Sequence, residues 1–280
     1  MKNILITGAT SGIGLATALE LAKQGNTIHI VGRNQVRIDN TLKELLRINP
    51  TLKHSAFLAD LSSQQAILSL AKDIIRQLPQ LDVLINNAGA YFSEQNFSVD
   101  KIELTWSTNH LAYFLLTHEL LPLLKSSAPA RIVNVASHSH YKGKINFEDI
   151  NLTNGWDGYK AYEQSKLANV LFTMELARKL VGTQITVNAL HPGVVSTEIA
   201  QKNAAWYVKA FWSLARLTVA INVEKGAETS VYLATSPKVE GESGKYYDKC
   251  KHKWQSHFSQ TPGLAEQCWE LSCKMTNITW

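Results

Sequence analysis

The chain has 280 residues, of which 45% are hydrophobic and 18% are charged, with a formal net charge of +5. This balance is typical of a folded globular protein and excludes a disordered chain, and the length favours one domain over two. The positive charge is spread along the chain apart from a cluster in residues 245–253, so it does not indicate nucleic-acid binding.

Short apolar runs of strand length alternate with longer segments of helical period. Strands are expected at residues 4–6, 27–31, 55–58, 83–85, 131–135 and 185–190, with a late strand at 244–247. Helices are expected near residues 13–24, 36–48, 63–77, 100–125, 160–181 and 224–235. Strands without polar alternation are buried on both faces, and helical crossovers require them to be parallel. The sequence predicts an α/β fold with a doubly wound parallel sheet, a Rossmann-type three-layer sandwich in a single domain over residues 1–280.

The first expected strand runs into Thr7-Gly8-Ala9-Thr10-Ser11-Gly12-Ile13-Gly14, and a helix is expected directly behind it. Glycines let the backbone approach a pyrophosphate, and the free amides of a helix N-terminus bind its charge. The alternative is a tight turn that binds nothing. The context favours a dinucleotide site with these candidate residues: Gly8, Ser11, Gly12, Ile13 and Gly14.

The second expected strand ends in Ile30-Val31-Gly32-Arg33-Asn34, without the acid that would hold the ribose hydroxyls of NAD. Arg33 can form charge-assisted bonds to a 2′-phosphate, and Ser11 and Asn34 are polar candidates beside it. The alternative is that Arg33 is a solvated surface charge. Its position favours NADP(H) over NAD(H).

Tyr162 and Lys166 are four residues apart on an expected helix and so lie on one face. An ammonium near a tyrosine favours the phenolate and lowers its pKa from the usual value of about 10. The pair is therefore a candidate for proton transfer. By contrast, the spacings of His110, His138, His140 and His191 match no metal motif, and no metal site is expected.

Together with Asn86-Asn87-Ala88-Gly89, these motifs resemble the short-chain dehydrogenase/reductase superfamily over essentially the whole chain. Within it the sequence is most similar to the retinol dehydrogenase group, on Asn109-His110-Leu111, Ser165-Lys166-Leu167-Ala168-Asn169, His191-Pro192-Gly193 and Gly244-Lys245-Tyr246-Tyr247. The resemblance implies that Tyr162 exchanges a proton with the substrate oxygen and that Lys166 also binds the nicotinamide ribose. It implies that Ser137, with Ser139 as the alternative, hydrogen-bonds that oxygen. It also implies that Asn109 breaks its helix and holds a water in a proton relay from the lysine.

The resemblance also implies further cofactor contacts, to the adenine, the adenosine side and midsection, and the nicotinamide amide: Asp60, Leu61, Asn87, Ala88, Gly89, Pro192, Gly193 and Thr197. Asp60 could also cap the helix that follows it, and Pro192-Gly193 could be a plain turn.

Two segments follow strand ends, where such sheets bind ligands. The first, between Ser137 and Tyr162, carries aromatic residues that suggest an apolar substrate wall: His140, Tyr141, Phe147, Trp156 and Tyr159. The second, at about 194–222, is expected to insert a substrate lid with a helix at 204–217. That helix could instead contact a second subunit or a membrane surface.

We expect an enzyme that transfers a hydride between NADP(H) and a lipophilic aldehyde, ketone or alcohol. The alternatives are a non-catalytic NADP(H)-binding sensor or interaction protein on the same fold, and a nucleotide-sugar epimerase. No signal peptide or membrane-spanning run is recognisable. The three cysteines are odd in number and show no Cys-x-x-Cys spacing, which suits a reducing compartment. A cytoplasmic location is therefore expected. A homo-oligomer is compatible with the sequence.

Overall fold

The computed structural model describes residues 1–193 and 223–280. Within them, one sheet has the order β3-β2-β1-β4-β5-β6-β7-β8. The strands β1 to β7 are parallel, and β8 pairs antiparallel with β7 at the edge. Their bounds are β1 (Asn3–Thr7), β2 (Thr27–Gly32), β3 (Ser55–Leu58), β4 (Val83–Asn86), β5 (Ala130–Val135), β6 (Ile185–His191), β7 (Tyr246–Asp248) and β8 (Lys251–Lys253). The predicted doubly wound parallel sheet is confirmed.

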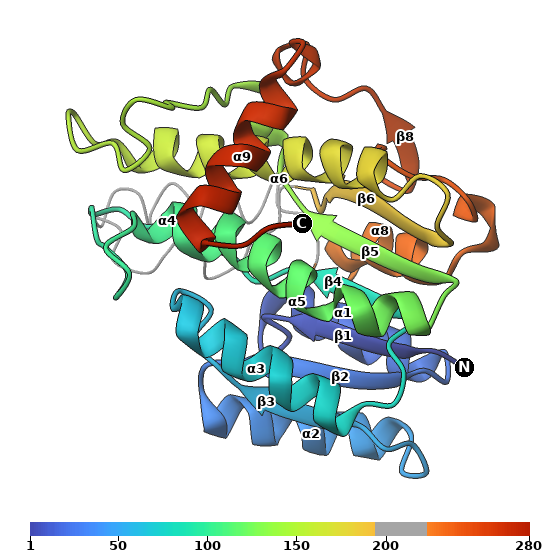
Figure 1. Ribbon diagram of the computed structural model, residues 1–280. Helices are drawn as coiled ribbons and strands as arrows, with labels where there is room; N and C mark the ends of the chain where they lie inside the picture. The colour runs from blue at the N-terminus through green and yellow to red at the C-terminus, as the bar shows by residue number, and fades with distance from the viewer. Residues whose placement is uncertain (194–222) are drawn as a thin grey trace.

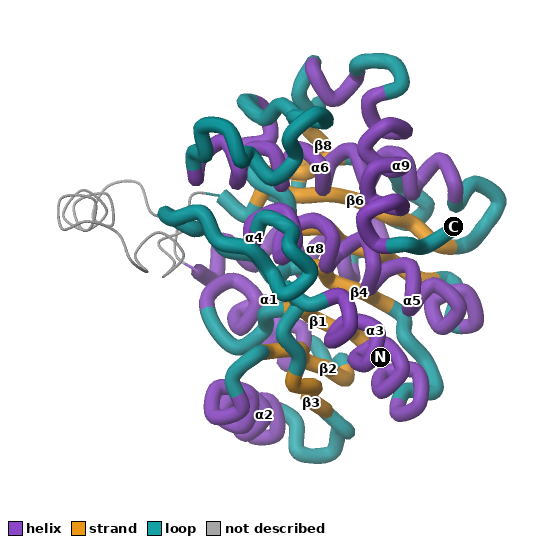
Figure 2. The backbone as a smooth tube through the Cα atoms, turned by 60° about the vertical axis from the view of Figure 1, so that its left-hand side comes forward, coloured by secondary structure: helices purple, strands orange, loops and turns teal. Residues whose placement is uncertain are grey.

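Helices cover both faces of this sheet (Figures 1 and 2). One face carries α1 (Gly12–Lys23), α2 (Gln35–Ile48) and α8 (Val223–Thr235); the other carries α3 (Gln64–Gln77), α5 (Ala112–Ser126) and α6 (Gly158–Lys179). Side chains of β1 alternate between the two layers, with Ile4 and Ile6 in the first core and Leu5 in the second. Both faces of the strand are buried, which is why its sequence shows no polar alternation.

The helix expected at residues 100–125 is present, but it starts at Leu104 and is not α-helical throughout. The chain instead forms a short α4 (Leu104–Trp106), a π-turn over Ser107–Leu111 and then α5. The helix begins at Leu104 and not at residue 100 because Glu103 caps it: the Glu103 carboxylate accepts hydrogen bonds from the backbone amides of Thr105 and Trp106. The π-turn inserts an extra residue beside Asn109, as such turns often do at functional sites.

A C-terminal helix, α9 (Leu264–Thr276), was not predicted. It packs against α6 (Figure 1) through a buried cluster that includes Leu264, Cys268, Leu271 and Met275. These four positions repeat at helical spacing, so the signal was present in the sequence. Strand β8 was also missed, because its three exposed residues, Lys251–Lys253, carry no apolar pattern.

The proposed lid at 194–222, its helix at 204–217 and Thr197 lie outside the described residues. Across the two described ranges, no helix has the length and apolar character that crossing a membrane requires.

Candidate active site

The glycine loop between β1 and α1 is packed too tightly for side chains. Gly8 has φ +66°, and a Cβ there would lie 2.8 Å from Ala88 Cα. A Cβ on Gly14 would collide with the Gly8 carbonyl oxygen and the Asn87 side-chain amide. Helix α1 begins at Gly12, next to Ile13, and its N-cap Ser11 makes no side-chain capping bond. The first-turn amides are therefore available to an anion, and the loop fits a pyrophosphate.

The turn after β4 is bonded to this loop. The backbone amides of Asn87 and Ala88 donate to Thr7 Oγ1 at 2.9 and 3.0 Å, and Asn87 Nδ2 donates to the Thr7 carbonyl oxygen at 2.8 Å. The structure thus brings Gly8 and Gly14 together with the Asn87-Ala88-Gly89 turn. These motifs are some eighty residues apart in the chain.

Gly14→Ala is expected to destabilise the folded protein by about 2 kcal/mol, because the added methyl group collides with backbone that cannot move aside. Urea unfolding measures this loss. Gly25→Ala is the control for backbone strain alone, since Gly25 has φ +79° and open space around it, and its cost is about 1 kcal/mol. A Gly14→Ala protein as stable as the parent would contradict the close packing.

The four predicted catalytic residues come from three elements and meet at the carboxyl edge of the sheet. Tyr162 and Lys166 are on α6, Ser137 follows β5, and Asn109 lies in the π-turn. Lys166 Nζ donates to the Val135 carbonyl oxygen at 3.0 Å and lies 5.6 Å from the Tyr162 ring centroid. The Tyr162 hydroxyl is hydrogen-bonded to Ser137.

The side-chain amide of Asn109 is fixed by hydrogen bonds to Ala90 and Ser165. Its Oδ1 accepts from the Ala90 amide at 2.8 Å, and its Nδ2 donates to the Ala90 carbonyl oxygen and to Ser165 Oγ. A Cβ on Gly89 would lie 3.3 Å from both Asn109 Oδ1 and Lys166 Nζ. Asn109 therefore connects the turn after β4 to the helix that carries Tyr162 and Lys166. The relay water remains a prediction.

Burial dominates the electrostatics of this site. It lowers the pKa of Lys166 to about 7, and it raises the pKa of Tyr162 against an opposing hydrogen bond from Ser137. The expectation that the lysine lowers the tyrosine pKa is therefore not met in this structure, because the burial of the phenol outweighs the other effects. Ser139, the alternative to Ser137, donates its backbone amide to Ser137 Oγ at 3.1 Å and so supports it.

The residues predicted for the 2′-phosphate and the adenine follow β1, β2 and β3. Arg33 and Ser11 are exposed, and Asn34 caps α2 by accepting from the Arg37 amide at 3.0 Å. Asp60 does not cap α3, because it accepts from Ser62 at 2.9 Å, while Ser63 is the cap. Leu61 is buried after it, at 8% exposure. Pro192 and Gly193 follow β6, with Gly193 at φ +85°.

The aromatic wall is only partly as expected. Phe147 packs into the core beside α9, so it does not line the site. Tyr91, which the sequence analysis missed, lies with its ring centroid 5.1 Å from Tyr159 and 6.2 Å from Tyr162. Tyr91 comes two residues after the Asn-Asn-Ala-Gly motif, and this short separation along the chain could have marked it as a site residue.

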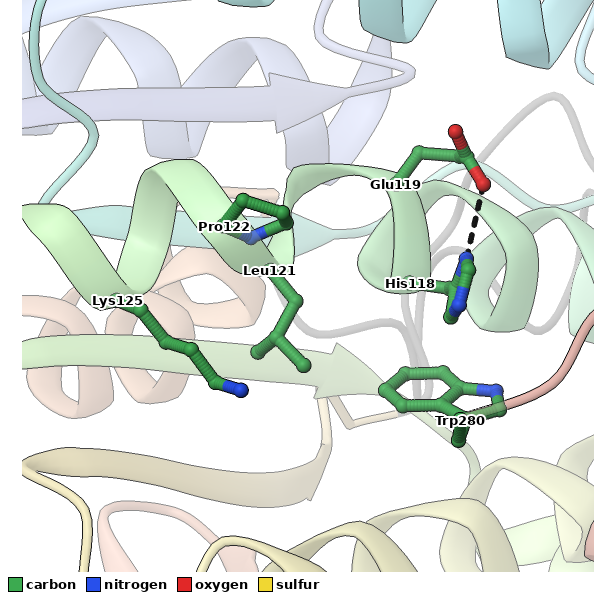
Figure 3. Close-up of a pocket in the computed structure, with 6 residues that line it drawn as sticks. All are labelled: His118, Glu119, Leu121, Pro122, Lys125 and Trp280. Atoms are coloured by element: carbon green, nitrogen blue, oxygen red, sulfur yellow. Dashed lines mark hydrogen bonds and ion pairs between the residues drawn. The ribbon is translucent and has the colours of Figure 1, made fainter.

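A cavity of about 290 Å³ lies elsewhere, on the outer side of α5 (Figure 3). Its lining contains none of the predicted site residues: His118, Glu119, Leu121, Pro122, Lys125 and Trp280. Within the described parts of the chain, no three His, Cys, Asp or Glu side chains gather as they would around a metal ion.

The family model for short chain dehydrogenases matches residues 2–208. Among similar proteins, the Homo sapiens "Retinol dehydrogenase 14" is 38% identical over 99% of this chain and 87% of its own length. The Homo sapiens "Retinol dehydrogenase 12" is 39% identical over 100% of this chain and 87% of its own length.

Among solved structures, an uncharacterised protein from Mycobacterium Paratuberculosis has a TM-score of 0.78 at 29% identity and covers 99% of this chain and 94% of its own. A Burkholderia cenocepacia short chain dehydrogenase in complex with NADP has a TM-score of 0.69 at 24% identity, over 88% of this chain and 94% of its own. The fold, the glycine loop and the family match agree, and the chain belongs to the short-chain dehydrogenase family.

Proposed function

We propose that this oxidoreductase reduces or oxidises an apolar carbonyl or alcohol with NADP(H), using Ser137, Tyr162, Lys166 and Asn109. The observation that carries the proposal is the meeting of these residues beside the glycine loop. Members of this family bind a nicotinamide cofactor, and the loop between β1 and α1 fits its pyrophosphate.

When bound, the nicotinamide supplies or accepts the hydride. Ser137 Oγ hydrogen-bonds the substrate oxygen and holds it beside the Tyr162 hydroxyl. In reduction, Tyr162 gives its proton to that oxygen as negative charge develops there. Lys166 Nζ then stabilises the phenolate that remains, and Asn109 holds the surrounding backbone in place.

NADP(H) preference rests on Arg33, an exposed cation at the carboxyl end of β2 where an NAD site would carry an acid. Its guanidinium can form two charge-assisted hydrogen bonds to a 2′-phosphate. Ser11 is exposed and can add a hydroxyl donor.

Arg33→Asp is expected to lower kcat/KM for NADPH by about tenfold to a hundredfold, because it replaces an attractive charge by a repulsive one. The NADH value should fall much less or rise. Steady-state kinetics with both cofactors measures the ratio. Arg47→Asp makes the same charge change in the last turn of α2 and should leave the ratio unaltered. An unchanged ratio in Arg33→Asp would exclude the 2′-phosphate role.

An apolar substrate is supported by the tyrosines beside Tyr162 and by relatives named retinol dehydrogenases. Tyr91 is half-buried, and Tyr159 is 61% exposed. They offer ring faces rather than charges to a substrate at this edge of the sheet.

The proposed function is tested by NADPH consumption with aliphatic, aromatic and terpenoid aldehydes and ketones, repeated with NADH. Turnover is expected for the more apolar carbonyls and with NADPH over NADH. Binding of NADPH without turnover of any of them would favour a non-catalytic sensor. The cytoplasmic location and a homo-oligomeric state remain predictions.

A further inference from the structure

His110 follows Asn109 in the π-turn and plays no part in the proposed proton transfer. Its imidazole is 1% exposed, yet both ring nitrogens have polar neighbours. Nδ1 lies 3.2 Å from Asn169 Oδ1 on α6, and Nε2 lies 2.8 Å from Ser272 Oγ on α9. Asn169 Nδ2 in turn donates to the main-chain oxygen of Asn109 at 2.9 Å. A buried chain of hydrogen bonds thus runs from the C-terminal helix to Asn109.

The direction of each bond in this chain follows from the donors available. Asn169 uses its NH₂ group on Asn109, so its oxygen faces His110 as an acceptor. Nδ1 must then carry a proton, and in a neutral imidazole Nε2 is left as an acceptor. Burial lowers the pKa of His110 to about 4, which keeps the ring neutral near pH 7. Nε2 therefore needs a donor, and the Ser272 hydroxyl is the one in reach.

The opposite tautomer, with the proton on Nε2 of His110, does not give all of these buried atoms a hydrogen-bond partner. With the proton on Nε2, Ser272 could donate instead to the Cys268 carbonyl oxygen, 2.7 Å away. Nδ1 and Asn169 Oδ1 would then meet as two acceptors. Rotation of the Asn169 amide would relieve that contact but would turn its oxygen toward the Asn109 carbonyl oxygen. Each alternative removes the bond to Asn109 or leaves a buried acceptor unpaired.

We propose that Ser272 and His110 are positioning residues that hold the catalytic π-turn through Asn169, with Asn169 selecting the Nδ1–H tautomer and Ser272 donating to the Nε2 that this tautomer leaves as an acceptor. This inference rests on the proposed function for its kinetic consequence. Asn109 bonds Ala90 and Ser165, next to Gly89 and Lys166, so a displaced turn moves the groups that serve proton transfer. The family model ends at residue 208, so α9 lies beyond the part of the chain it matches.

Ser272→Ala removes the donor to Nε2 with little change of volume. The His110 proton is expected to stay on Nδ1, where Asn169 accepts it, while Nε2 becomes a buried acceptor without a partner. The less firmly held ring is expected to lower kcat about tenfold, with KM and NADPH affinity within about twofold of the parent values. Ser272→Thr keeps the hydroxyl and should retain the parent kcat. Ser230→Ala is the matched control, because Ser230 in α8 is equally buried and its hydroxyl has no hydrogen-bond partner among the described residues.

The tautomer is read from two-bond ¹H–¹⁵N spectra of protein labelled with ¹⁵N-histidine, with His110→Gln identifying the signals. Parent protein with the proton on Nε2 would overturn the proposal, as would a Ser272→Ala enzyme with the parent kcat. The spectrum needs no substrate. A protein with the expected tautomer that turns over no carbonyl would therefore count against the proposed function, whereas active protein with the wrong tautomer counts only against this inference.

Discussion

Tyr162→Phe is expected to lower kcat for carbonyl reduction by about a thousandfold, the scale typical of losing a general acid. The substitution removes only the hydroxyl that is proposed to give up the proton. Burial raises the pKa of Tyr162, so the phenol holds its proton at neutral pH and is ready to donate it. Single-turnover reduction at saturating NADPH measures the chemical step.

NADPH binding should be nearly unchanged in this variant, because the glycine loop and Arg33 are untouched. Fluorescence titration of NADPH checks this. Tyr232→Phe on α8 removes a hydroxyl from the opposite face of the sheet and should keep full activity. Retained turnover in Tyr162→Phe would remove the tyrosine from the mechanism and leave the family assignment standing.

The sheet and the glycine loop could be predicted because local sequence determines them. Strands β1, β2 and β4 are apolar runs buried on both faces, and each is followed by a helix or a turn. Gly8 and Gly14 occupy positions where a Cβ does not fit, so the motif reports a packing requirement. Tyr162 and Lys166 are close because they are four residues apart on α6, which places them on the same face of the helix.

The apolar pattern does not predict the π-turn near Asn109, because the hydrogen-bond partners that hold it are distant in sequence, and only the family resemblance pointed to a broken helix there. Asn109 is bonded to Ala90, Ser165 and Asn169, which lie 19, 56 and 60 residues away. A pattern of apolar residues at helical spacing says nothing of these partners, so it predicts one continuous helix. The sequence analysis also gave His110 no role, because its spacing matches no metal motif. Its hydrogen-bond partner Ser272 is 162 residues away, so the local sequence does not indicate this contact.

Burial of Lys166 should make this lysine costly for the stability of the folded protein. The lysine is 3% exposed, and its pKa falls from 10.5 to about 7. Above pH 10.5 it is neutral whether the chain is folded or unfolded, so burial costs little. Between pH 10.5 and 7 only the unfolded chain takes up the proton, and stability falls as pH falls. Below about pH 7 the folded protein carries the full cost of a buried charge.

Lys166→Met keeps the length of the side chain and removes the charge. The variant is expected to be more stable than the parent by roughly 2–5 kcal/mol at pH 6, with the gain shrinking toward zero as pH approaches 10.5. Urea unfolding at a series of pH values measures the difference. Lys160→Met, on the exposed side of α6, should give no such pH-dependent gain.

The same variant should lose about a hundredfold or more in kcat, since no other described cation lies as close to the Tyr162 ring to stabilise its phenolate. A more stable and less active protein is the result expected when a buried charge is retained for catalysis. A Lys166→Met protein that is less stable than the parent at pH 6 would instead show that the bond from Lys166 Nζ to the Val135 carbonyl oxygen outweighs the cost of burying the ammonium.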